Sequence, residues 1–236
     1  MGMLRDRLAL TDGSACLRGT GQTVTAVVGC LESGELPVKL IRPNGLVAAD
    51  LIAALAQNSL GDDQSMGTAL MQASPANRAL LPSLSESAWV AVFPSVPHRT
   101  RLNLSAGLLQ IHDFWDASHD AAQRADDLGE RDFSAYWHGI AHRREPDAGN
   151  AAYWFRRVGK HAVFKPLAVA ARTLLDQEGD AQLGDRLIPG GVWNPVVMIE
   201  LCTQAQSGTR EEIVARKLQR LEMWLLLEAT CAAITG

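Results

Sequence analysis

The chain has 236 residues, of which 47% are hydrophobic and 20% charged, so it can fold around a sizeable core. Its formal net charge of −4 argues against general binding of nucleic acid, which normally requires an excess of basic residues. The sequence has no secretory signal, no CxxC pair and no apolar run long enough to span a membrane, so we expect a cytoplasmic protein with reduced cysteines.

The N-terminal part of the chain is the less regular one. Residues 23–28 (TVTAVV) fit a β-strand, but residues 21–31 can equally be drawn as a helix. Residues 46–56 favour a helix because their apolar side chains share one face. The proline-rich segment PSVP then marks a boundary. We therefore predict an irregular or mixed region, 1–97, that packs on a helical domain, 98–236.

The second part of the chain has the periodicity of helices, and we predict an all-α fold, a single helical bundle. Apolar residues recur at three- and four-residue steps from about Arg99, which predicts one long helix to about residue 126. A helix over 132–144 must end before Pro146. Capping signals and apolar stripes predict four more helices, which begin near Asp147 or Asn150, at Lys165, after Asn194 and after Thr209.

Histidines are concentrated where the first two of these helices would pack together. His112, Asp116 and His119 would share one face of the first helix, and His138 and His142 are one turn apart on the second. If the helices are antiparallel, the four imidazoles can meet as metal ligands, with Asp116 as a further ligand. Imidazole and carboxylate groups suit a divalent ion such as zinc, manganese or iron.

Two other interpretations of the histidines stay open. Without a metal, His119, Asp116 and His142 would act as catalytic acid–base groups, with Asp116 fixing the tautomer of a neighbouring imidazole. In either case we expect a hydrolase- or lyase-type enzyme or a ligand-binding protein. In the third interpretation the histidines only stabilise the packing of the helices.

Basic and aromatic residues surround the histidines and predict the class of ligand. Arg143 and Arg157 could bind a carboxylate or phosphate, and Trp115 and Tyr136 could form the walls of the binding site. The expected partner is thus a small anionic molecule, and a homo-oligomer is compatible with the sequence. The alternative is that the arginines pair with surface acids and that the aromatic rings lie in the core.

Long motifs in this part of the chain carry a resemblance. The segments HDFWDASHDAAQ and YWHGIAHRREPDAGNAAYWFRRVGKHAVF resemble a family of uncharacterised helical proteins from bacteria and some fungi, over about residues 105–165. That resemblance implies no particular activity. The segment PDAGNAAYWFRRVG is also similar to one unit of a tetratricopeptide or Sel1-type repeat. This second resemblance implies the alternative function, a non-catalytic helical module for protein interaction.

Overall fold

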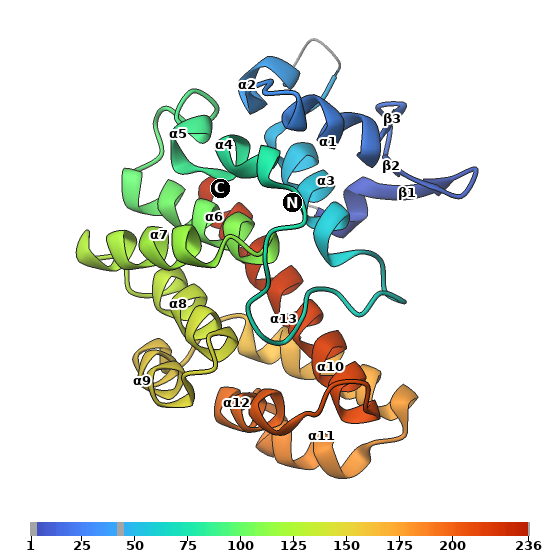
Figure 1. Ribbon diagram of the computed structural model, residues 1–236, viewed down its shortest axis with the longest axis vertical. Helices are drawn as coiled ribbons and strands as arrows, with labels where there is room; N and C mark the ends of the chain where they lie inside the picture. Colours follow the sequence, from blue (N-terminus) through green and yellow to red (C-terminus); the bar gives the residue numbers. More distant parts are fainter. Residues whose placement is uncertain (1–3, 42–44, 236) are drawn as a thin grey trace.

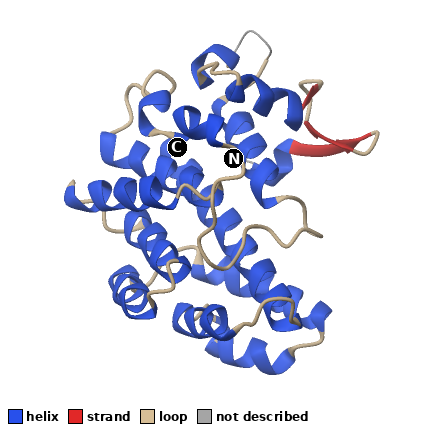
Figure 2. Cartoon of the chain, viewed as in Figure 1, coloured by secondary structure: helices blue, strands red, loops and turns tan. Residues whose placement is uncertain are grey.

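The computed structural model describes residues 4–41 and 45–235, and helices make up most of this chain (Figures 1 and 2). The predicted all-α class is confirmed. The sheet in these residues is small and consists of the antiparallel strands β1 (Leu8–Thr11), β2 (Ser14–Leu17) and β3 (Gln22–Thr23), which follow the short 3₁₀ helix η1 (Leu4–Arg7).

Strands β1 and β2 form a β-hairpin that we did not predict from the sequence. Thr11 pairs with Ser14, so the loop consists of Asp12 and Gly13 alone, with φ angles of 50° and 76°. Two positive φ angles are the requirement of a type I′ turn, for which Asp-Gly is a favoured sequence. The hairpin places Leu17 in the core.

The first helices of the chain settle one ambiguity of the sequence and extend one predicted helix. Helix α1 (Val24–Glu32) occupies the segment that also fitted a strand, and its first turn is capped by the Thr23 hydroxyl, which accepts from Ala26 N at 3.1 Å. After α2 (Pro37–Leu40), helix α3 (Ala48–Leu60) runs one turn beyond its predicted end. Short elements follow: η2 (Arg78–Leu80), α4 (Leu81–Leu84) and α5 (Glu86–Trp89).

The long helix predicted from residue 99 to 126 is wrong, because the chain turns at residues 112–114. It forms α6 (His98–Ile111) and α7 (Trp115–Asp127) instead, and these two helices pack against each other. The turn is a Schellman motif: Phe114 N donates to Leu109 O at 3.0 Å, and Asp113 N donates to Gln110 O at 3.3 Å. Asp113 adopts the left-handed conformation (φ 63°) that glycine usually takes in this motif.

The remaining helices, apart from α11, agree closely with the sequence prediction. They are α8 (Phe133–Arg144), α9 (Ala148–Val158), α10 (Phe164–Glu178), α11 (Ala181–Leu187), α12 (Pro195–Gln204) and α13 (Arg210–Thr235), with the 3₁₀ turn η3 (Pro189–Gly191) before α12. The predicted capping residues carry out that role: Asp147, Asn194 and Thr209 each accept a hydrogen bond from a backbone N–H in the first turn of α9, α12 and α13. Helix α11 was not predicted.

Helix α13 joins the two ends of the molecule. Figure 1 shows it, in red, crossing from its C-terminal end beside α6 to its N-terminal end beside α10, and it also contacts α3 and α12. One hydrophobic core contains residues from both sides of residue 97, and the two-part division of the chain stays a prediction. Within residues 4–41 and 45–235, no helix is both long and apolar enough to cross a membrane.

Candidate metal centre

Three imidazoles converge where α7 packs against α8. His119 on α7 and His138 and His142 on α8 each offer a nitrogen, and these atoms all lie within 4.8 Å of one another. The His138 and His142 rings are stacked, with centroids 4.9 Å apart. The His119 ring stands edge-on to both of them, at 4.3 and 5.1 Å. Residues from two helices therefore form one group, which we call the histidine cluster.

Two tryptophans hold the rings of the histidine cluster in position. The Trp115 indole stacks on His119 at 5.2 Å, and its Nε1 donates to Ala141 O at 2.7 Å, which fixes it against α8. The Trp154 indole, from α9, stacks on His138 with centroids 3.9 Å apart. The rings of the cluster thus have restricted rotation before any ligand binds, a property that metal sites generally require.

The hydrogen bonds of the cluster leave nitrogens for a further ligand. His142 Nδ1 lies 2.7 Å from Glu145 Oε2, so its Nε2 is the nitrogen that can take another partner. His138 is 1% exposed, and its buried Nδ1 has no hydrogen-bond partner in the described part of the chain. A buried polar atom without a partner is costly. A bound ion at this position would remove that cost.

The protonation state of the cluster also suits a cation. Burial, followed by the neighbouring His119 and His142, lowers the pKa of His138 to about 3. Burial and then His142 lower the pKa of His119. Both imidazoles are therefore neutral near pH 7, which is the form that binds metals.

The dimensions of the cluster are close to those of a metal site. Nitrogen atoms around a tetrahedral zinc ion are about 3.3 Å apart, so nitrogens that lie within 4.8 Å of one another need at most a small approach to reach this spacing. The His119 side chain is 27% exposed and can make this movement, whereas His138 is enclosed. A second group, His142, Glu145 and Asp147, is also compact, but both of its carboxylates are already engaged. The Glu145 carboxylate accepts a hydrogen bond from His142, and the Asp147 carboxylate accepts one from Asn150.

Two predicted site residues lie outside the histidine cluster. His112 caps the C-terminal end of α6, where its buried Nε2 is 3.1 Å from Leu55 O, and burial lowers its pKa to about 4. The turn at 112–114 separates His112 from His119, so the four imidazoles do not form one group. Asp116 is exposed near the start of α7 and lines a neighbouring cavity.

Arg143 and Tyr136 point into the core rather than toward the imidazoles. The Arg143 guanidinium forms a fully buried ion pair with Glu222 of α13 at 2.6 Å, and the Tyr136 hydroxyl donates to the same carboxylate at 3.0 Å. Burial and then the Glu222 charge raise the pKa of Tyr136 well above its usual value. Both residues connect α8 to α13.

Arg157 is the predicted anion-binding residue that lies near the histidine cluster. Its guanidinium lies over the Trp154 ring at 4.9 Å and pairs with Asp126 at 2.8 Å, and its charge contributes to the lowered pKa of His138. Trp154 and Glu145 belong to the site but were not predicted as site residues. Glu145 follows His142 by three residues, a spacing that places both on one helix face.

Comparison with known proteins gives no further assignment. No protein-family model, curated protein or solved structure matches this chain.

Proposed function

We propose that the protein binds a divalent transition metal through His119, His138 and His142 and uses it to act on a small anionic molecule. The observation that carries the proposal is the convergence of these three imidazoles, one of which, His138, has a buried Nδ1 that lacks a partner among the described residues. Zinc is the first choice because three imidazoles suit it, whereas manganese prefers carboxylates. Iron is the alternative.

The donor set favours a reactive site over a purely structural one. A zinc ion held by three histidines keeps a fourth position open and lowers the pKa of bound water to about 7, which supplies a nucleophile at neutral pH. Because the His119 side chain is 27% exposed, a substrate would approach that position from the side of His119. An anionic substrate fits the positive charge of the ion and of the nearby Arg157.

Glu145 has the role of a positioning residue in this proposal. Its carboxylate accepts from His142 Nδ1, which fixes the imidazole tautomer and turns Nε2 toward the cluster. Loss of such a carboxylate typically weakens metal binding by about 10- to 100-fold.

The proposal is tested by metal binding to the purified, chelator-treated protein. Equilibrium dialysis against zinc, followed by elemental analysis, should give one bound ion per chain, and cobalt should give the visible absorption of a tetrahedral site. His119→Ala and Glu145→Ala should each weaken binding at least tenfold. His98→Ala, which removes an exposed histidine, is the matched control.

His119 is preferred to the buried His138 for this test because its replacement leaves the core intact, and circular dichroism should show that the variant stays folded. The proposal fails if the folded wild-type protein binds no metal at micromolar concentration. It also fails if His119→Ala binds as tightly as His98→Ala does.

A further inference from the structure

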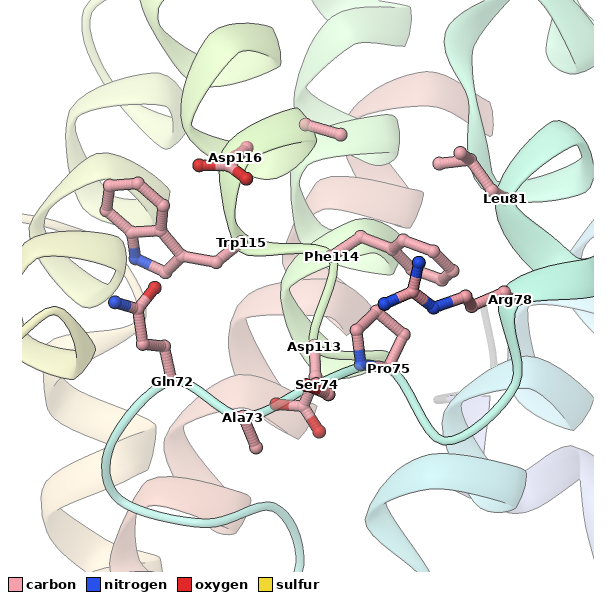
Figure 3. A pocket seen from close by; sticks show the side chains of 11 residues that line it. Gln72, Ala73, Ser74, Pro75, Arg78, Leu81, Asp113, Phe114, Trp115 and Asp116 are labelled. Carbon is pink, nitrogen blue, oxygen red and sulfur yellow. The ribbon is translucent and has the colours of Figure 1, made fainter.

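A cavity of about 610 Å³ lies beside the start of α7, and its lining residues include no histidine within the described part of the chain. Its walls are residues 113–117, where the turn meets the start of α7, and the loop at 72–75, with Arg78 and Leu81 at one side (Figure 3). Trp115 belongs both to this cavity and to the stack on His119. The volume is in the range of small-molecule sites, about 300–1,000 Å³.

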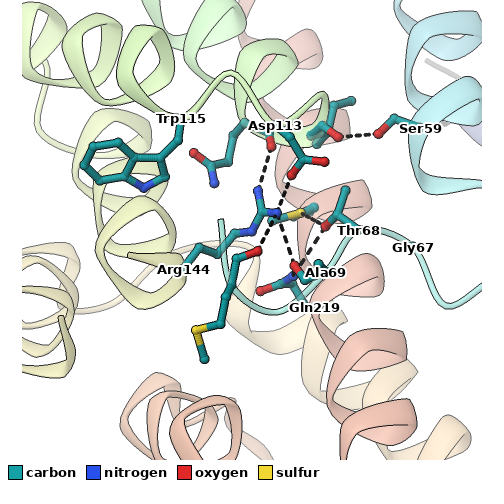
Figure 4. A network of polar contacts seen from close by, with 12 residues as sticks. Ser59, Gly67, Thr68, Ala69, Asp113, Trp115, Arg144 and Gln219 are labelled. Carbon is teal, nitrogen blue, oxygen red and sulfur yellow. Dashed lines mark hydrogen bonds and ion pairs between the residues drawn. The ribbon is translucent and has the colours of Figure 1, made fainter. Parts of the chain in front are cut away.

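Both walls of the cavity are bonded to one buried residue, Arg144. Its guanidinium, fully buried, pairs with Asp113 and donates to the carbonyl oxygens of Gln110 and Ala69 at 3.0 and 3.1 Å (Figure 4). Its own carbonyl accepts from Gln72 N at 2.7 Å. Both walls of the cavity are therefore fixed to the same residue, so the site needs little ordering when a ligand binds.

Two charged side chains of opposite sign at this cavity have no partner among the described residues. Arg78 and Asp116 are exposed, both line the cavity, and neither side chain forms an ion pair or hydrogen bond within residues 4–41 and 45–235. The charge of Asp113, by contrast, is already balanced by Arg144. Phe114 and Trp115 add apolar surface to the lining, with Phe114 on the side of Arg78 and Trp115 on the other side of Asp116 (Figure 3).

We propose that this cavity binds a small zwitterion with an apolar body, of the class of the aromatic amino acids. A guanidinium is the best donor for a carboxylate, so Arg78 would hold the acid group of the ligand. Asp116 would pair with its ammonium group, and Phe114 and Trp115 would contact its ring. A ligand with only one of these charges would leave the opposite protein charge without a partner.

The binding proposed for the cavity does not depend on a metal. Measurements on chelator-treated protein therefore test it separately from the proposed function, and a failure of one does not imply a failure of the other.

The test is isothermal titration calorimetry with three ligands that share one body: phenylalanine, 3-phenylpropionate and 2-phenylethylamine. Phenylalanine should bind most tightly. Arg78→Ala should weaken the binding of phenylalanine and of phenylpropionate about tenfold and leave the binding of phenylethylamine unchanged. Asp116→Asn should weaken the binding of phenylalanine and of phenylethylamine and leave the binding of phenylpropionate unchanged. Arg99→Ala removes an exposed arginine outside the cavity and is the control.

Both substituted side chains are exposed, so the variants should fold as the wild-type protein does. The proposal is overturned if phenylalanine does not bind. Equal affinities for the three ligands, or equal effects of Arg78→Ala and Arg99→Ala, would also overturn it.

Discussion

At the scale of single residues, His112 shows how burial converts a candidate metal ligand into a structural group. A carbonyl oxygen can only accept, so the 3.1 Å contact identifies His112 Nε2–H as the donor to Leu55 O. The neutral ring satisfies this bond, whereas a charged ring would lose its hydration in the core. His112 therefore links the end of α6 to α3.

The lowered pKa of His112 makes stability depend on pH. Its folded pKa is about 4 against 6.5 in the unfolded chain, so the unfolded state takes up the proton first as the pH falls. The contribution of His112 is complete above pH 6.5 and is lost between 6.5 and 4, an effect of about 3 kcal/mol. Urea unfolding at pH 7 and at pH 4.5 measures how much the free energy of unfolding falls between these pH values. This fall should be smaller in His112→Gln than in the wild-type protein, because the variant lacks the titrating ring.

The matched control for this prediction is His98→Gln, since it removes an exposed histidine whose recorded ion pair is with Glu86 rather than with α3. Parallel stability curves for the wild-type protein and His112→Gln would show that the ring is protonated equally in both states, contrary to the expectation.

At the scale of elements, the close approach of α6 to α8 and α13 depends on a missing side chain. A Cβ atom at Gly107 would lie 2.7 Å from Trp137 Cζ2 and 3.2 Å from Leu227 Cδ1. The indole is enclosed and cannot move away, because Trp137 is fully buried. Glycine at this position therefore sets the distance between three helices.

Two glycine substitutions should change stability in opposite directions. Gly107→Ala should destabilise the protein by about 1–3 kcal/mol, because overpacking outweighs the gain in helix propensity. Gly29→Ala, in α1, places a Cβ where no atom lies within 4 Å and should stabilise by about 0.5–1 kcal/mol. Thermal unfolding of both variants measures the difference, and a shift of equal sign for the two would contradict it.

The sequence was informative about elements whose signals are local. Asn194 and Thr209 predict where their helices begin, because a cap depends only on the next few residues. The structure shows both caps. The turn at Asp113 was missed because a helix end of this type is recognised by glycine, and aspartate occupies the left-handed position here. The Asp12-Gly13 hairpin carries its usual signal, so this turn could have been predicted from the sequence.

The candidate site was only partly accessible to such reasoning. Spacing predicted that His112 or His119 would meet His138 or His142 if the helices were antiparallel. The nitrogens of His119, His138 and His142 do lie together, whereas His112 lies apart. Spacing could not place Arg143 or Tyr136, because every residue of α8 from Ser134 to Arg144 is buried. A helix enclosed on all sides has no solvent face by which to orient its polar residues. Their partners come from α13, which is distant in the sequence.

At the scale of the whole molecule, a buried ion pair connects the histidine-bearing helix to the central one. Arg143 and Glu222 are both fully enclosed, and the Arg143 Nε and Nη1 atoms have no hydrogen-bond partner among the residues described. Such a pair adds little to stability compared with apolar residues, but loss of one partner leaves a buried charge uncompensated.

A double-mutant cycle should reveal this coupling. Arg143→Met should lower the free energy of unfolding by about 3–5 kcal/mol, and Glu222→Leu by a similar amount. The double variant should recover most of that loss, because neither charge is then left unpaired. Urea unfolding of the four proteins measures the coupling. Additive effects of the two substitutions would mean that the charges do not depend on each other.

The turn at residues 112–114 has a consequence for how relatives of this chain should be compared. If α6 had continued straight, His119 would lie about 12 Å further along its axis, away from α8. Deletion of one residue at the turn would rotate His119 by about 100° around α7. A homologue could therefore retain all three histidines in an alignment and yet have lost the arrangement that brings their nitrogens together. The length of this turn is therefore as informative in such a comparison as the histidines themselves.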